Sequence, residues 1–170
     1  MPEAPSIEDL MATCQQSAVH LELRDGYMRD DPRFIAWLDG RLAEGMAESE
    51  RPWLEVIANA TARGVAVRRA RIISEPISDY VRYEYDLTPG NVASGERVRW
   101  LPRRQATSLA LPGNDFWLFD GQVLLLNHFD GDGNFVDHEV ISDPEVIKFF
   151  AVAFEAVWDR SIPHEEYRPA

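Results

Sequence analysis

The chain has 170 residues, of which 45% are hydrophobic and 27% charged, and it carries a formal net charge of −12 at pH 7. This length and composition predict one globular domain with a buried core. The acidic balance argues against direct nucleic-acid binding, because contacts to phosphates need a basic surface.

The single cysteine, Cys14, excludes an internal disulfide and is typical of a reducing compartment. It lies on the apolar stripe of a predicted helix, so we expect a buried structural thiol rather than a nucleophile. The chain has no stretch of about 18 apolar residues and no N-terminal signal region, which predicts no membrane partner. We therefore expect a cytoplasmic protein.

The first third of the chain predicts three helices and one strand. Ser6 and Asp9 resemble a capping box ahead of a helix. Alternating apolar and polar residues from Val19 to Arg24 predict a half-buried strand that ends at Asp25-Gly26. A second helix begins at Asp31-Pro32 and turns its apolar residues inward: Phe34, Ile35, Leu38 and Leu42. The acidic residues 43–50 are interpreted as a connector, and Pro52 opens a third helix that ends at Gly64.

The middle of the chain predicts a strand, a helix and a second strand. The first strand runs from Val65 to Ile73 and the second from Val98 to Leu101. Between them, a helix begins at Pro76 and has to stop before Pro89. This order favours parallel neighbours joined by a right-handed crossover.

The last third predicts antiparallel strands and one strong helix. Residues 116–119, 123–127 and 135–141 are separated by short Gly-rich turns, and Asp143-Pro144 caps a helix with a wide apolar stripe. An irregular tail begins near Ser161. The whole chain therefore predicts a single α/β domain over residues 1–170, a mixed sheet with helices packed against it. Ligands tend to bind at the carboxyl ends of parallel strands, here near residues 73–75 and 101–104.

Guanidinium, phenol and carboxylate groups gather near that edge. Arg69 and Arg71 share a strand face and could form an anion pocket that Arg99 or Arg103 completes. A solvated face or pairing with carboxylates is the alternative. Tyr80, Tyr83 and Glu84 share one face of the next helix, where a tyrosine beside an arginine could act as an acid or base with a lowered pKa. Amphipathic tyrosines at the core rim that pair with arginines are the alternative. We predict a ligand site from the following residues: Arg69, Arg71, Glu75, Asp79, Tyr80, Arg82, Tyr83, Arg103, Trp117 and Asp120.

Two short motifs have simpler interpretations. Asp120-Gly121 indicates a hairpin turn, with a catalytic aspartate as the alternative. Residues 130–134 start like a calcium loop, but Phe135 and Ile141 stand where glycine and glutamate are required, so we expect a hairpin without metal. The sequence has no paired metal-ligand histidines, phosphate loop or dinucleotide motif, and we expect no cofactor.

Three segments carry a family resemblance: WLEVIANATARGVAVRRARIISEPISDYVRYEYDLTPGNVASGERVRWLPR, DFWLFDG and FDGDGNF, together with the helix of Trp158. They resemble an uncharacterised family of small actinomycete proteins, a domain of unknown function, over residues 17–164. The resemblance implies a protein partner, because members are often encoded beside helix-turn-helix regulators. It implies no particular activity.

The order of elements is also similar to half-domains of the phospholipase D superfamily, whose His-x-Lys-x4-Asp motif supplies a histidine nucleophile. Residues 101–121 contain no histidine and no lysine, so this similarity implies a degenerate, sensor-like version of the fold. We therefore expect a non-catalytic regulatory or ligand-sensing domain that binds an anionic small molecule or a partner such as a helix-turn-helix regulator. A small-molecule enzyme of specialised metabolism that uses Asp79, Tyr80, Arg82 and Tyr83 is the alternative, and a pure assembly subunit is a third possibility.

Overall fold

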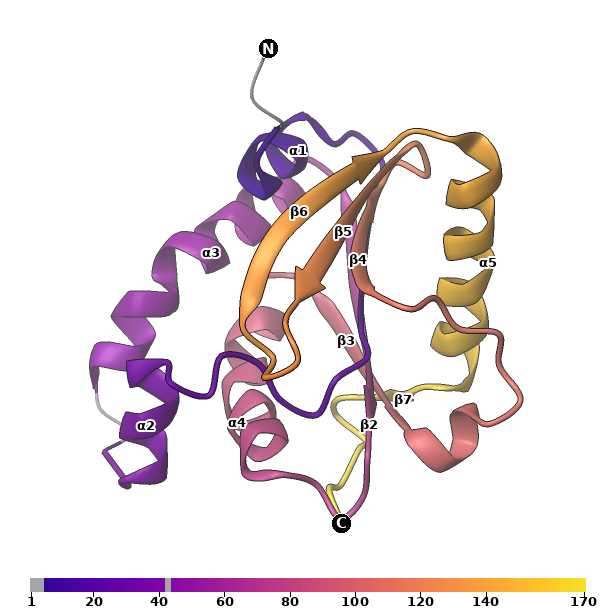
Figure 1. The fold of residues 1–170 in the computed structure, drawn as a ribbon. Helices are drawn as coiled ribbons and strands as arrows, with labels where there is room; N and C mark the ends of the chain where they lie inside the picture. The colour runs from indigo at the N-terminus through magenta and orange to yellow at the C-terminus, as the bar shows by residue number, and fades with distance from the viewer. Residues whose placement is uncertain (1–4, 42–43) are drawn as a thin grey trace.

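Figure 1 shows helices packed on both faces of one mixed sheet. The computed structural model describes residues 5–41 and 44–170, without the side chains of residues 44–49. Within these residues the strand order is β6-β5-β4-β1-β2-β3-β7. The strands are β1 (Ser17–Glu22), β2 (Ala66–Ile73), β3 (Arg97–Pro102), β4 (Asp115–Phe119), β5 (Val123–Phe129), β6 (Phe135–Ile141) and β7 (Ile162–Pro163).

The sheet combines a parallel half with an antiparallel half. β1, β2 and β3 run parallel, whereas β4, β5 and β6 form an antiparallel meander beside β1. Asp120 and Gly121 both have positive φ, 51° and 65°, which suits the tight turn between β4 and β5. The predicted mixed sheet and both predicted hairpins are confirmed.

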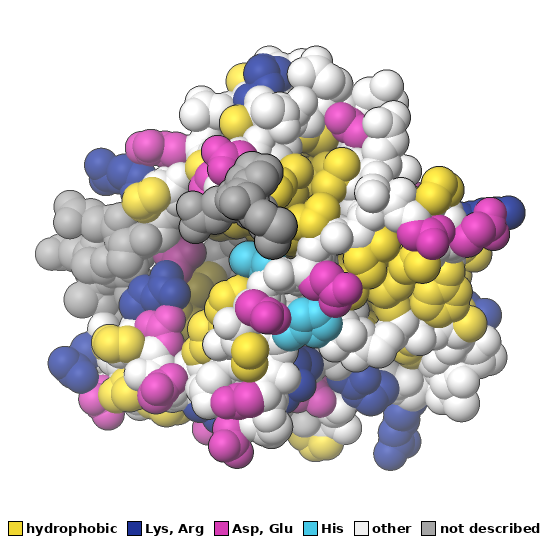
Figure 2. Space-filling view, turned by 45° about the horizontal axis from the view of Figure 1, so that its top comes forward, with side chains coloured by type: hydrophobic (Ala, Val, Ile, Leu, Met, Phe, Trp, Pro, Cys, Tyr) yellow, Lys and Arg dark blue, Asp and Glu magenta, His cyan; other side chains and the backbone are white. Residues whose placement is uncertain are grey.

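One face of the sheet packs against α5 (Pro144–Arg160) and forms an apolar layer. The Asp143 carboxylate caps this helix by accepting a hydrogen bond from the Glu145 N–H at 2.9 Å. Phe154 and Val157 are fully buried there, against strand residues such as Leu21 and Ile72. On the outer side of α5, Phe149 and Val152 are exposed, and Figure 2 shows hydrophobic side chains gathered over this helix.

The other face carries the remaining α-helices, which are α1 (Ile7–Thr13), α2 (Pro32–Leu38), α3 (Glu44–Ala62) and α4 (Asp79–Ala93). Met11, Ile57 and Trp117 belong to a core cluster that α1 and α3 share with the sheet, and Val81 and Trp100 belong to one under α4. A single 3-10 turn, η1 (Arg103–Ala106), follows β3. In the described part of the chain, no helix is long and apolar enough to cross a bilayer.

Three predicted helix boundaries are wrong. Residues 44–50 of the predicted acidic connector belong to α3, which begins at Glu44 instead of Pro52, and Ala43 lies outside the described residues. Most of them are good helix formers, and Glu50 pairs with Arg33 of α2. α4 begins at Asp79 rather than Pro76, and it continues past Pro89, because packing of its buried face outweighs the hydrogen bond that proline cannot donate.

The prediction for the second helix is also partly wrong. α2 ends at Leu38, and only Phe34 of its apolar residues is buried, while Ile35 and Leu38 are exposed. The predicted inward Leu42 lies outside the described residues. The tail beyond Ser161 has little regular structure, as expected, but it packs closely, because Tyr167 stacks on Trp100 with ring centroids 5.4 Å apart.

Candidate functional site

Alternation along two neighbouring strands places four ionisable side chains on the face covered by α3 and α4. In the parallel register, His20 of β1 lies beside Arg69 of β2, and Glu22 lies beside Arg71. Successive residues of a strand point to opposite faces, so all four share one face. Arg68 points the other way and pairs with Glu155 of α5, as the alternation predicts.

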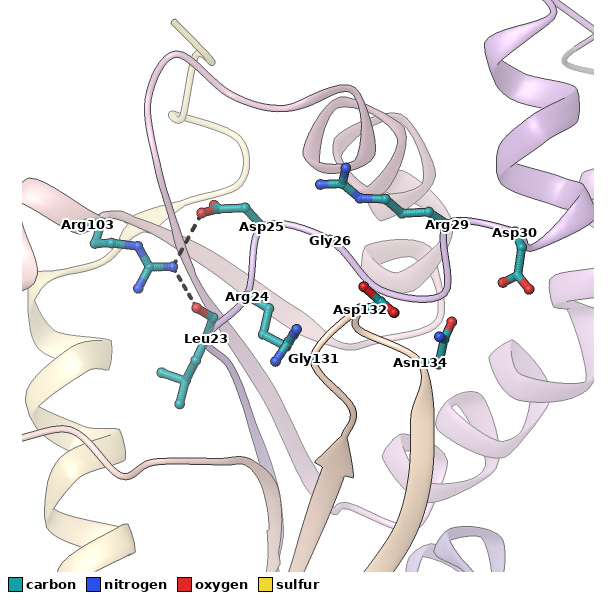
Figure 3. A pocket seen from close by; sticks show the side chains of 10 residues that line it. All are labelled: Leu23, Arg24, Asp25, Gly26, Arg29, Asp30, Arg103, Gly131, Asp132 and Asn134. Carbon is teal, nitrogen blue, oxygen red and sulfur yellow. Dashed lines mark hydrogen bonds and ion pairs between the residues drawn. The ribbon is translucent and has the colours of Figure 1, made fainter.

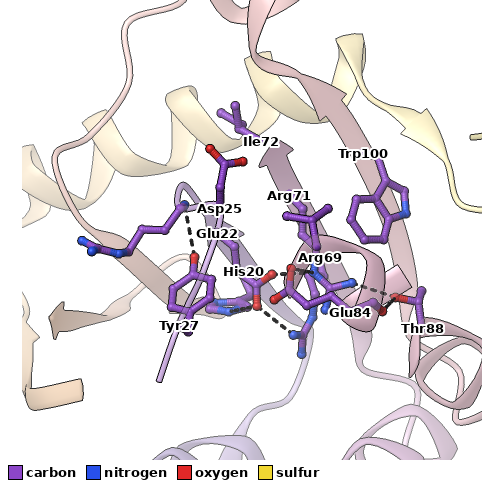
Figure 4. A network of polar contacts seen from close by, with 12 residues as sticks. His20, Glu22, Asp25, Tyr27, Arg69, Arg71, Ile72, Glu84, Thr88 and Trp100 are labelled. Atoms are coloured by element: carbon purple, nitrogen blue, oxygen red, sulfur yellow. Dashed lines mark hydrogen bonds and ion pairs between the residues drawn. The ribbon is translucent and has the colours of Figure 1, made fainter. Parts of the chain in front are cut away.

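Glu22 is the centre of a buried ion-pair network (Figure 4). Its carboxylate accepts hydrogen bonds from Arg69 Nη1 at 3.0 Å and from Arg71 Nε at 2.5 Å. Arg69 Nε also donates to Glu96 at 2.6 Å, and Arg71 Nη1 donates to the Thr88 hydroxyl at 2.7 Å. Burial by itself would raise the pKa of Glu22, but Arg71 and Arg69 outweigh it and hold that pKa well below 4.5.

His20 extends this network toward β4. Its Nδ1 lies 2.8 Å from the Phe116 carbonyl oxygen, and its Nε2 lies 3.2 Å from Glu22 Oε1. These two contacts fix the ring between β4 and Glu22. The ring stacks on Trp117 with centroids 4.3 Å apart.

Asp115 is a second buried carboxyl of this face. It accepts hydrogen bonds from the Tyr27 hydroxyl and from the Leu23 N–H, the latter at 3.0 Å. Burial raises the pKa of Asp115 to about 6, although the Tyr27 hydroxyl opposes this change. Burial also raises the pKa of Tyr27, and the charge of Asp115 adds to it.

Glu84 of α4 is the third buried carboxyl, and it has the weakest contacts. Its side chain accepts no hydrogen bond from any described residue, and the nearest cation is Arg71 Nε at 3.9 Å. Burial raises the pKa of Glu84 to about 8; Arg71 opposes this change and Glu22 adds to it. Glu84 is therefore a buried acid that titrates near neutral pH.

These side chains line a pocket of about 230 Å³ between the sheet, α3 and α4. Aromatic residues form much of its wall, namely Tyr27, Trp53, Tyr80, Tyr83 and Phe129. Burial raises the pKa of Tyr83 to about 12 and raises that of Tyr80 further. The lowered tyrosine pKa considered from the sequence is therefore wrong, because burial of the phenols outweighs the nearby arginines.

A larger, open groove of about 790 Å³ lies beyond the carboxyl ends of the parallel strands (Figure 3). Arg103 lies there, where its Nη2 donates to the Leu23 carbonyl at 2.6 Å and lies 3.7 Å from Asp25. Arg24 lines the same groove, and its Nε is buried without a hydrogen-bond partner among the described residues. Unlike the pocket, this groove is lined mainly by exposed and half-buried side chains, so we take the buried pocket as the candidate site.

The structure brings part of the predicted site together. Arg69, Arg71, Tyr80 and Tyr83 line the pocket, and Trp117 lies behind it, under His20.

The other predicted residues lie elsewhere. Glu75 accepts a hydrogen bond from the Tyr167 hydroxyl at 2.7 Å, and Asp79 and Arg82 are exposed on α4. Arg103 belongs to the open groove. The Asp120 carboxylate accepts hydrogen bonds from the N–H groups of three consecutive residues, 15, 16 and 17.

Sequence reasoning missed His20, Glu22, Tyr27 and Asp115. His20 and Glu22 were placed on the polar face of a half-buried strand, whereas both are buried in the structure. The signal was present, because acidic and basic residues at alternating positions of two adjacent parallel strands can pair across them.

Comparison with known proteins identifies the family. Residues 5–169 match a family described as Domain of unknown function (DUF6879). This chain belongs to the DUF6879 family. No curated protein matches it in sequence.

The fold of this chain is similar to that of a phospholipase D family member. Nuc from Salmonella typhimurium, a phospholipase D family member, aligns with a TM-score of 0.54 at 10% identity, over 95% of this chain and 88% of that one. NucT from Helicobacter pylori aligns with a TM-score of 0.53 at 11% identity, over 92% and 87%. The expected phospholipase D-like topology is confirmed for the fold, and identities this low say nothing about activity.

Proposed function

We propose that this DUF6879 chain is a non-catalytic ligand-sensing domain that binds a small molecule in the central pocket and acts with a protein partner. The observation that carries the proposal is the pocket itself, where polar groups from β1, β2, β4 and α4 converge on one buried space. Concave sites with a few convergent polar groups and perturbed pKa values are the usual form of ligand sites.

The residues around the β4–β5 turn support a sensor over a phosphodiesterase. Counted back from Asp120, the His-x-Lys-x4-Asp pattern places Asp115 at the lysine and Gly113 at the histidine. Glycine offers no nucleophile, and Asp115 brings a negative charge where a phosphate needs a positive one. Asp120 is itself engaged by backbone N–H groups.

The partner is proposed from the family resemblance, in which members are often encoded beside helix-turn-helix regulators. In this view, ligand binding changes the affinity for that regulator. The net charge of −12 favours a protein partner over direct contact with nucleic acid.

A small-molecule enzyme is the second candidate. Glu84 and Asp115 face the same pocket with pKa values of about 8 and about 6, which suits general acid–base chemistry near neutral pH. These two carboxyls would replace Asp79 and Arg82 in the role expected from the sequence, because those two residues are exposed.

The test uses the indole N–H of Trp53, which lines the pocket, as an NMR reporter. A fragment library with cationic, neutral and anionic members is added to labelled protein, and the Trp53→Phe variant assigns the signal. We expect some fragments to shift Trp53 while Trp158, which belongs to α5 on the opposite face of the sheet, stays unchanged. If no fragment of any charge moves Trp53, the pocket is not a ligand site. Chemical conversion of a bound fragment would favour the enzyme.

A further inference from the structure

The two arginines of the pocket are already neutralised by protein groups. Arg69 contacts Glu96 at 2.6 Å and Glu22 at 3.0 Å, and Arg71 contacts Glu22 at 2.5 Å. These carboxylates therefore already occupy the guanidinium N–H donors that an anionic ligand would use. An anionic ligand would have to displace these buried contacts.

At the edge of the pocket, the third arginine is also paired. Arg33 contacts Asp31 at 2.7 Å and also pairs with Glu50. All three arginines that line the pocket thus have carboxylate partners.

Two buried carboxyls remain after these pairs are made. Asp115 accepts hydrogen bonds from Tyr27 and Leu23, which partly compensate its burial. Glu84 is 8% exposed, lines the pocket and accepts no hydrogen bond from any residue that the structure describes. Its nearest cation, Arg71 Nε, is 3.9 Å away, too far for a hydrogen bond, so Glu84 is complementary to a donor that enters the pocket.

The aromatic wall favours the same kind of ligand. Tyr80 and Tyr83 precede Glu84 on α4, and Trp53 of α3 lines the pocket with them. Aromatic ring faces carry a negative quadrupole and attract cations, most strongly where water is excluded. Carboxylate and ring faces around one cavity form a site for an ammonium group attached to a flat or apolar body.

We infer that the central pocket recognises a small organic amine, whose ammonium group donates to Glu84 and whose apolar part lies against the tyrosine and tryptophan rings. This inference rests on the proposed function and specifies its ligand class, in place of the anion expected from the sequence. The volume of about 230 Å³ limits the amine to a compact molecule, smaller than the ligands of the roughly 300–1,000 Å³ sites that bind drug-sized compounds.

Three probes with the same ring and different head groups test the charge preference: benzylamine, benzyl alcohol and benzoate. Each is titrated into the full chain at about pH 8.5, where Glu84, whose pKa is about 8, is mostly ionised, while the Trp53 indole N–H is followed by NMR. We expect benzylamine to bind at least about tenfold more tightly than benzoate. Glu84→Gln, which keeps the shape and removes the charge, should weaken benzylamine by about tenfold or more, the effect of one charge-assisted hydrogen bond, and leave benzyl alcohol unchanged.

Glu145→Gln is the matched control, because Glu145 is an exposed glutamate of α5 far from the pocket wall. It should leave all three affinities unchanged. If benzoate shifts Trp53 and binds more tightly than benzylamine, the amine inference is wrong, but the pocket is still a ligand site. Benzylamine binding that Glu84→Gln does not weaken would overturn the role of Glu84. If none of the three probes shifts the Trp53 signal although other fragments do, the amine inference is wrong. If no fragment of any kind shifts that signal, the proposed function is wrong.

Discussion

Glu22→Gln should strongly destabilise the protein. The glutamate side chain is 10% exposed, pairs with the guanidinium groups of Arg69 and Arg71, and contacts the His20 ring. Glutamine keeps the shape but leaves the guanidinium groups without their shared carboxylate, and removing one partner of a buried ion pair costs about 3–5 kcal/mol. Arg69 retains Glu96, so we expect the lower end of that range, about 3 kcal/mol. In a domain of this size the melting temperature should fall by about 6–12 °C.

Urea unfolding at pH 7 measures the change, with Glu155→Gln as the control. Glu155 pairs with Arg68 at 2.6 Å, but its side chain is 54% exposed, and such a pair contributes only about 0–1 kcal/mol. If Glu22→Gln and Glu155→Gln differ by less than about 1 kcal/mol, the network does not stabilise the fold as argued.

Acid provides an independent check on the same variant. The pKa of Glu22 is held below 4.5 in the folded state, so its contribution is present above pH 4.5 and is lost as the pH falls further. The gap between wild type and Glu22→Gln should therefore shrink in acid. A gap that stays constant down to pH 2 would contradict the assignment.

Three further predictions concern other carboxyls and the chemistry. The folded state holds a proton on Glu84 up to pH 8, whereas the unfolded chain releases it near 4.5, because burial outweighs the effect of Arg71. Stability should therefore fall between these pH values, and Glu84→Gln should unfold at higher urea than wild type at pH 8.5 and at equal urea at pH 4. Asp120→Ala should cost about 1–3 kcal/mol in urea unfolding by leaving backbone N–H groups unpaired, whereas the exposed Asp132→Ala should stay within about 0.5 kcal/mol. Bis-p-nitrophenyl phosphate should not be hydrolysed above background, and turnover that survives repurification would show a phosphodiesterase.

Local patterns predicted most of the fold. The hairpins follow from Asp120-Gly121 and residues 130–134, and α5 follows from its cap and apolar stripe. Local patterns failed where tertiary contacts decide, at the start of α3 and where α4 continues past Pro89. Propensity is a weak guide in such places, because packing of a buried face can outweigh a proline.

The site was predictable only where it lies within one segment. Arg69, Arg71, Tyr80 and Tyr83 fall within fifteen residues of sequence, and their spacing indicated a shared region. Glu22 and Asp115 come from distant segments and reach the pocket through the pairing of β1 with β2 and β4. Alternation identified a polar strand face, but it could not show that helices cover that face and bury its charges.

The two faces of the sheet differ in how they tolerate sequence change. Under α5 the layer is apolar, so residues such as Ile72 or Leu21 can be exchanged one at a time for others of similar volume at modest cost. On the opposite face, a relative that loses Glu22 alone keeps two buried guanidinium groups with too few partners, so Arg69 and Arg71 have to change with it. Among DUF6879 relatives these positions should therefore be replaced as a set, while the apolar layer under α5 changes gradually.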